Sequence, residues 1–376
     1  MKAPPLTQAL SRAVRLARHG ALLSRRAACA ALLTSASLAA HAQPVSFQDM
    51  QGSPIVLEQA STRAVTLPMP AGSMWLSLAR DPRKLAGMHP DSYTHMRQGL
   101  LARMFPGAQH IRADVTRSGF VPNVESLLQM QPDLIWQWGH MGDELLAPLR
   151  QAGLTVAALL YGDEARVREW IRLMGTALGE TARAEAQLAW RLQVEQQLRA
   201  VTDSLTPQEQ ARVMLLSRYA PQHQVAGGSG NFQFDVSLAG GRNVAEAVGN
   251  ANIVNIEQIM AWDPEVILLN NFENGLTPDT LYQDPMFADI SAVREHRVYK
   301  IPAGGYRWDP PGQESPLYWL WLSQILHPEK FNWPMRDLIR EQFMQLYGYQ
   351  ASDADLDQVL HLQLNAQAQG YERFKP

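Results

Sequence analysis

The chain of 376 residues has a single cysteine, Cys29, and it lies within the first 42 residues. If that segment is removed after export, the rest of the chain can form no disulfide and has no thiolate chemistry. Positive charge is also scarce. Residues 43–376 hold 33 − 6 = 27 Lys and Arg against 36 Asp and Glu, a formal charge of −9. Nucleic-acid binding relies on basic patches, so this composition argues against it.

Motifs for catalysis and for a resident metal are missing as well. Gly228-Ser229-Gly230 lacks the spacing of a G-x-S-x-G nucleophile elbow, and no G-x-x-x-x-G-K-[ST] phosphate loop occurs. The histidines are scattered, with no H-x-x-x-H pair and no His/Cys cluster, which argues against a dedicated zinc site. A catalytic dyad assembled only in space leaves no such signature. A secreted α/β enzyme acting on a small anionic substrate therefore remains an alternative hypothesis.

Residues 1–42 are predicted to be a secretory signal peptide. They contain six basic residues and no acid, then an apolar segment from Ala27 to Ala40 and the small-residue pattern Ala40-His41-Ala42. The apolar segment is too short for a membrane span, and cleavage is expected before Gln43. Export without disulfides favours a soluble protein of the bacterial periplasm.

A stretch of sequence occurs twice. Residues 123–136 recur 132 positions later as residues 255–268, with Asn, Glu, Pro and Ile identical over the first thirteen positions. Each copy predicts a short helix ended by proline, followed at once by an apolar run that suits a strand covered on both faces. A repeat at this spacing indicates that each half of the protein uses the same supersecondary unit.

Strands alternate with helices on both sides of a purely helical region, residues 163–205. Alternation of this kind predicts mostly parallel sheets. Residues 181–205 are predicted to form one helix of about 37 Å, and residues 225–231 a glycine-rich loop. The predicted fold is α/β with two lobes, 43–180 and 206–376, each with a mostly parallel sheet flanked by helices. The helix 181–205 joins the lobes, and the second lobe ends in a helical tail.

Candidate ligand-binding residues follow from the position of the strands. In parallel α/β sheets ligands bind beyond the carboxyl ends of the strands, where polar and aromatic side chains gain weight. Such loops facing one another would form a cleft for a rigid, partly aromatic or anionic ligand. The candidates that follow predicted strands are Trp138, His140, Arg218, Tyr219, Asn271, Tyr306, Arg307 and Trp308.

Each of these candidates also has a structural interpretation. Trp138 and Trp308 could serve packing, and His140 could be an exposed loop residue. Arg307 beside Asp309 could form a local ion pair, worth little if exposed. Direct ligation of a metal by the protein is left open.

The whole pattern resembles the substrate-binding proteins of ABC importers for ferric siderophores, haem, cobalamin and related metal complexes. The features that carry the resemblance are the signal peptide, the two α/β lobes, the long connecting helix, and Asn-x-Glu-x-Leu/Ile ahead of Pro-acid and a strand. It covers about residues 63–360. Residues 306–331 are similar to a subgroup that includes binders of nickel complexes and molybdate. The segment 87–111 departs from the best-known siderophore binders, and Tyr93 and His95 within it are further ligand candidates.

The resemblance implies that a glutamate on each lobe docks against arginines of a membrane permease. Matched through the motif, these are Glu125 and Glu257. Either alone would suit a first-turn acid stabilised by the helix dipole, but their recurrence at matching positions favours a second role. The resemblance also implies limited hinge motion.

The sequence thus predicts a monomeric periplasmic binding protein without an intrinsic cofactor. Its expected cargo is a metal chelate, a ferric siderophore foremost. Its expected partners are the permease and ATPase of an ABC transporter in the inner membrane, with no role for nucleic acid. Cobalamin, haem, a nickel complex or a molybdate-type oxyanion are alternative ligands within the same class.

Overall fold

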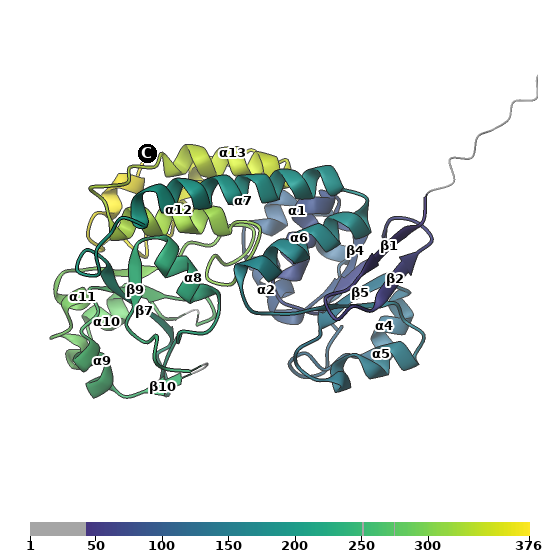
Figure 1. Ribbon diagram of the computed structural model, residues 1–376, viewed down its shortest axis with the longest axis horizontal. Coiled ribbons are helices and arrows are strands. Elements are labelled where there is room, and N and C mark those ends of the chain that lie inside the picture. Colours follow the sequence, from purple (N-terminus) through teal and green to yellow (C-terminus); the bar gives the residue numbers. More distant parts are fainter. Residues whose placement is uncertain (1–42, 250–251, 274) are drawn as a thin grey trace, which may run out of the picture. The chain divides into compact units, whose positions relative to one another are not determined.

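The computed structural model describes residues 43–249, 252–273 and 275–376 (Figure 1). The predicted signal peptide, residues 1–42, lies outside the described residues. The described chain falls within one compact unit, Ala42–Pro376. Within the described ranges, no helix is both long enough and apolar enough to cross a membrane.

The N-terminal lobe is built on a four-stranded parallel sheet with the order β4-β3-β5-β6. Every residue of its four strands is buried, as expected of a parallel sheet covered on both faces. The strands are β3 (Ala64–Thr66), β4 (Leu85–Met88), β5 (Leu134–Trp138) and β6 (Val156–Leu159), preceded by the hairpin of β1 (Val45–Gln48) and β2 (Pro54–Leu57). The helices are α1 (Ala71–Ala79), α2 (Pro90–Gln98), α3 (Leu101–Met104), α4 (Val124–Met130), α5 (Ala147–Gln151) and α6 (Glu164–Leu178).

The C-terminal lobe has a six-stranded sheet with the path β10-β8-β7-β11-β12, and β9 also pairs with β7. The pairs among β7, β9, β11 and β12 are parallel, whereas β8 and β10 join antiparallel, which confirms the mostly parallel sheet. The strands are β7 (Ala211–Arg218), β8 (His223–Val225), β9 (Gly241–Asn243), β10 (Asn252–Val254), β11 (Val266–Leu269) and β12 (Val298–Lys300). The helices are α8 (Asn231–Leu238), α9 (Ile256–Trp262), α10 (Pro278–Tyr282), α11 (Ser291–Arg294), α12 (Ser315–Leu326), α13 (Met335–Tyr347) and α14 (Asp353–Val359).

The repeated sequence forms the same unit in both lobes, α4 with β5 and α9 with β11. Both helices end at a residue in the left-handed conformation, Gln131 with φ 50° and Asp263 with φ 41°. Three residues, of which the left-handed one is the first, separate the helix from the strand in each copy. A connection this short turns the chain back, so each strand runs antiparallel to its helix. The first turn of each helix therefore lies at the edge of the sheet where the parallel strands have their carboxyl ends.

The acid after each proline ties the unit to the neighbouring strand. Asp133 accepts hydrogen bonds from the backbone N–H groups of Thr62 and Arg63 at 2.6 and 2.9 Å, just before β3. Glu265 accepts from the N–H of Arg212 in β7 at 2.8 Å. The Pro-acid pattern thus fixes two strands side by side in each lobe.

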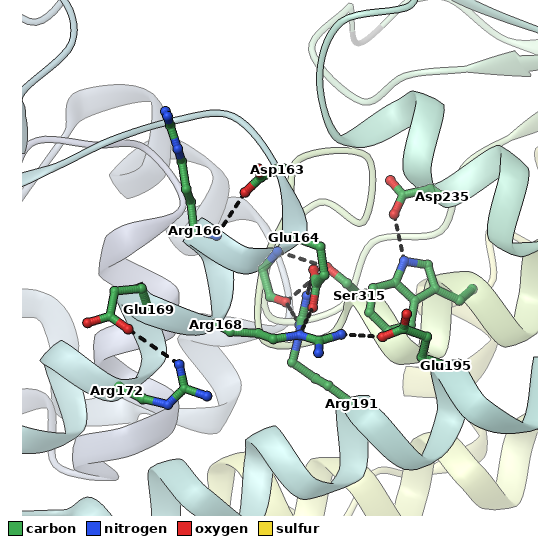
Figure 2. A network of polar contacts seen from close by, with 12 residues as sticks. Asp163, Glu164, Arg166, Arg168, Glu169, Arg172, Arg191, Glu195, Asp235 and Ser315 are labelled. Carbon is green, nitrogen blue, oxygen red and sulfur yellow. Dashed lines mark hydrogen bonds and ion pairs between the residues drawn. The ribbon is translucent and has the colours of Figure 1, made fainter. Parts of the chain in front are cut away.

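The connecting helix α7 (Thr181–Thr202) packs against α6 of the first lobe and α12 of the second (Figure 1). Arg191, near its middle, is 1% exposed. Its Nε and Nη2 donate to the Glu164 carboxylate at 2.9 and 2.6 Å, and its Nη1 donates to the carbonyl of Gly312 at 2.6 Å. Figure 2 shows this guanidinium directed at Glu164. One buried side chain of the connecting helix therefore contacts both lobes.

Candidate functional site

A cavity of about 420 Å³ opens where strands of both sheets end. We call it the cleft. Many of the residues that line it lie at the end of a strand or in the loop after it, for β3, β5, β6, β7, β11 and β12. This agrees with the rule that α/β proteins bind ligands at the carboxyl ends of strands. Hollows of about 530 and 610 Å³ also occur, but they lie at the opposite ends of strands, near the start of β12 and of β7. The cleft is lined by Met69, Pro70, Trp138, Tyr161, Leu215, Ser217, Val225, Ala226, Gly227, Ser229, Gly230, Asn231, Phe232, Asn270, Phe272, Tyr306, Asp309 and Pro310.

Aromatic rings supply much of the cleft wall. Trp138, the last residue of β5, meets Tyr161 edge-on with ring centroids 6.0 Å apart. It also packs against the buried Trp170 at 5.4 Å, which holds its indole in place. Phe232, Phe272 and Tyr306 bring further rings from the second lobe. Rigid aromatic faces of this kind bury a large area of a flat or apolar ligand.

The cleft lining carries almost no formal charge. Among the described residues it contains no lysine, arginine, histidine or cysteine, and its one carboxyl group belongs to Asp309. Burial raises the pKa of Asp309 above its usual range. Arg307 does not line the cleft but contacts two aromatic residues that do. Its guanidinium lies 4.4 Å from the ring centre of Phe272, and it donates to the Tyr306 hydroxyl at 3.2 Å.

One helix begins at the cleft after a glycine. Gly230, with φ 117°, occupies the position before α8 and has no side chain that could cap the first turn. Asn231, the first residue of α8, is 3% exposed, and its Oδ1 has no hydrogen-bond partner among the described residues. The free N–H groups of a first turn attract acceptor oxygens. The first-turn N–H groups can therefore donate to an oxygen atom of a ligand, whereas Asn231 Oδ1 is itself an acceptor.

The structure brings four of the predicted ligand residues to the cleft or its edge. Trp138 and Tyr306 line it. His140 packs on Trp138 with ring centroids 5.1 Å apart, and Arg307 lies behind the wall. Their contact with a ligand stays a prediction.

Two other predicted ligand residues, His95 and Asn271, line a separate cavity of about 300 Å³. Its wall also includes Lys300 and His361. His95 lies there beside Asn271, and its ring meets Tyr306 edge-on at 5.2 Å. Burial lowers the pKa of His95 to about 3 and that of His361 to about 4, so both rings are neutral. Asn271 Nδ2 donates to the carbonyl of Ile301 at 2.8 Å.

The remaining four do not line either cavity. Trp308 is 1% exposed and donates its indole N–H to Glu314 at 2.6 Å, which agrees with the packing interpretation. Tyr219 donates to Asp284 at 2.5 Å and packs against Phe287. Arg218, the last residue of β7, is exposed, and Tyr93 packs half-buried against the core.

Sequence reasoning overlooked several residues of the cleft. Tyr161 is the second residue after β6, so the rule that selected Trp138 would have selected it too. The rule does place Asn270 and Phe272 in the loop after β11, but of that loop only Asn271 is among the candidates above. Asn231 gave no comparable signal, because its position depends on where the glycine-rich loop ends.

The two predicted docking residues occupy equivalent places. Glu125 lies in the first turn of α4 and Glu257 in the first turn of α9, and both are exposed. Neither carboxylate forms an ion pair within the part of the chain that the structure describes. Both therefore remain available to a cationic partner.

Two lobes joined by a long helix, with an aromatic cleft at the strand ends, define a two-lobed solute-binding fold. Residues 115–304 match the family described as periplasmic binding protein, and the chain belongs to that family. The molybdate-binding protein MolA of Haemophilus influenzae is 22% identical over 240 residues, which is 56% of this chain and 65% of MolA. This chain thus spans a little less than two thirds of that relative.

Solved structures share the fold over most of the chain. A periplasmic solute-binding protein from Veillonella parvula is 27% identical, with a TM-score of 0.79 over 86% of this chain and 98% of its own. MolA with bound molybdate is 17% identical, with a TM-score of 0.69 over 82% and 99%. Helicobacter pylori CeuE in its Ni-His complex is 19% identical, with a TM-score of 0.69 over 85% and 99%. The predicted family and the two-lobed fold are confirmed.

Proposed function

We propose that this protein is a periplasmic solute-binding protein that captures a metal chelate, a ferric siderophore foremost, and delivers it to an ABC permease and its ATPase. The observation that carries the proposal is the aromatic cleft of about 420 Å³ at the carboxyl ends of the strands of both sheets. That volume falls within the range of about 300–1,000 Å³ typical of pockets for organic ligands.

The lining favours a metal held by an organic chelator over a metal held by the protein. Among the described residues, no group of three or more His, Cys, Asp or Glu side chains is placed to hold a metal ion. The chelator would supply the ligands instead, and its flat surfaces would pack on Trp138, Tyr161 and Tyr306. The first turn of α8 would receive one of its oxygens.

The alternative ligands divide by the same criterion. Haem, cobalamin and a nickel chelate share the organic surface that suits the aromatic wall. A bare oxyanion such as molybdate, the ligand named for MolA, would meet no cationic side chain in the lining. The enzyme hypothesis gains no support here, since the described residues of the lining include no histidine or lysine that could act as a general base.

Native mass spectrometry with elemental analysis tests the ligand. Protein purified from the periplasm of its own bacterium, after growth in iron-poor medium, is expected to carry an added mass with about one iron atom per chain. The same preparation made after denaturation and refolding is the control, and it should be free of the added mass. Retention of molybdenum without an organic component would refute the chelate, and an apoprotein that binds no chelate in titration would refute the binding function.

A further inference from the structure

The glycine-rich loop 226–230 contributes a stretch of the cleft wall that is mainly backbone. Its residues in the lining are Ala226, Gly227, Ser229 and Gly230, and the loop leads directly into α8. Glycine presents no side chain to a ligand, so the shape of this part of the wall depends on where the backbone lies. The residues behind the loop therefore matter for the cleft.

The loop leaves the sheet at a gap along one edge of β7. β8 pairs with the carboxyl end of β7, at Leu216 and Arg218, whereas β9 pairs with its start, from Ala211 to Val213. Both strands use the same edge, because β11 pairs along the other. The loop and α8 connect β8 to β9. The side chain at the end of β9 can therefore reach back to the loop.

Asn243, the last residue of β9, makes that connection. Its Nδ2 donates to the carbonyls of Ala226 and Gly227, both at 3.1 Å, and its Oδ1 accepts from the N–H of Ala245 at 3.0 Å. The residue is 2% exposed, so water has little access to these bonds. A side-chain amide supplies two donor hydrogens and an acceptor, and Asn243 uses all three.

The loop also lies close against the segment that follows Asn243. A Cβ on Gly227 would lie 1.9 Å from the carbonyl oxygen of Val248, and one on Gly228 would lie 2.2 Å from that of Glu246. Both obstacles are backbone atoms, so only glycine allows the approach. Hydrogen bonds on one side and backbone contact on the other thus determine the position of the loop.

We propose that Asn243 is a positioning residue for ligand binding, which holds the loop 226–230 in the conformation that the ligand meets. Asn243 does not line the cleft and acts through the carbonyls of Ala226 and Gly227. The loop is then ordered before the ligand arrives, so binding does not have to order it. The proposal rests on the proposed function, because it takes the cleft to be the place where the ligand binds.

The variant Asn243→Asp tests the positioning role. It keeps the shape and the acceptor for Ala245, but it replaces both donors with an oxygen that faces two carbonyl oxygens. In hydrogen exchange without ligand, the backbone amides of residues 226–232 should exchange about tenfold faster than in wild type, because two hydrogen bonds are lost. Affinity for a ferric tricatecholate, measured by quenching of tryptophan fluorescence, should fall about tenfold, because binding must then order the loop.

Asn365→Asp is the matched control. Asn365 is 0% exposed, its Nδ2 donates to the carbonyl of Lys300 at 2.9 Å, and its Oδ1 accepts from the N–H of Lys300 at 2.7 Å. These bonds tie the C-terminal tail to β12 and do not involve the loop. The control should lose stability as Asn243→Asp does, yet keep the wild-type affinity. An equal loss of affinity in both variants would reduce the effect to stability and overturn the proposal.

Gly228→Ala disturbs the same loop without altering Asn243, and it should lower the affinity too. Gly107→Ala is its control, since a Cβ there would meet Pro82 at an ordinary 3.7 Å. Unchanged loop exchange in Asn243→Asp overturns the proposal, and so does faster exchange with unchanged affinity. A wild-type protein that binds no chelate refutes the proposed function instead, and the exchange of residues 226–232 then decides whether Asn243 holds the loop.

Discussion

Asp235 on α8 is a buried acid, and its carboxyl group accepts a hydrogen bond from the indole N–H of Trp319 at 2.6 Å. Burial raises its pKa from 3.8 to about 8. The folded protein therefore keeps a proton that the unfolded chain releases. The stability that this proton contributes is fully present below about pH 3.8 and is lost as the pH rises toward 8.

Asp235→Asn keeps an acceptor for the indole and removes the titration. The free energy of unfolding of the variant minus that of wild type is expected to be larger at pH 8 than at pH 5, by more than about 1 kcal/mol. Urea denaturation at the two pH values measures the difference. Asp337→Asn, at a side chain that is 79% exposed, is the control and should show the same difference at both. A gain for Asp235→Asn that does not depend on pH would contradict the raised pKa.

Tyr161 offers a sharper test of the cleft than the buried Trp138, because its ring is 39% exposed and its loss should disturb the fold little. Tyr161→Ala is expected to weaken binding of a ferric tricatecholate about tenfold, since one aromatic wall is lost. Quenching of tryptophan fluorescence measures the affinity. Tyr219→Ala is the control, because Tyr219 also follows a strand but does not line the cleft. Equal losses in the two variants would place the ligand elsewhere.

At the residue scale, the sequence could indicate which loops carry ligand residues. It could not distinguish residues that line the cleft from residues that pack in the core. Trp138 ends β5 and Trp308 lies in the loop after β12, yet Trp138 lines the cleft while Trp308 is held by Glu314 in the core. The difference arises from partners that are distant in the sequence or specific to one loop conformation. Residue type and strand position do not contain that information.

At the element scale, local signals predicted the helices and central strands well. Proline, helical periodicity and apolar runs located α4, β5, α9 and β11, and they located the connecting helix to within three residues of its end. The short strands β8, β9 and β10 were not predicted, because their sequences form no apolar run, unlike β3 and β12, which are equally short but fully buried. Their pairing with β7 and with each other, rather than their sequence, makes them strands.

The connecting helix supports a prediction about a buried ion pair. Arg191→Met would leave the Glu164 carboxylate buried, with Arg168 as its remaining ion-pair partner, and is expected to cost about 3–5 kcal/mol of unfolding free energy. The double variant Arg191→Met, Glu164→Leu should recover part of that loss, since no unmatched charge remains. Urea denaturation measures both. Arg199→Met on the same helix, where the arginine side chain is 44% exposed, should cost under about 1 kcal/mol.

For the whole molecule, the repeat of 132 residues was the most informative signal, because it reports on both lobes at once. It predicted two sheets that each contain the same helix–strand unit, and the structure has them. It also put Glu125 and Glu257 at matching exposed positions. The repeat carries no information about the ligand, since the cleft is lined by loops that differ between the lobes.

Capture and delivery should therefore be separable in the intact protein. Glu125→Ala with Glu257→Ala changes two exposed side chains, neither of which lines the cleft, so affinity for a ferric tricatecholate is expected to stay within about twofold of wild type. Uptake of the iron-55 chelate by cells that carry only this variant is expected to fall to background, because docking then lacks both anionic contacts. The single variants should show intermediate uptake. Undiminished uptake by the double variant would show that the permease recognises another surface.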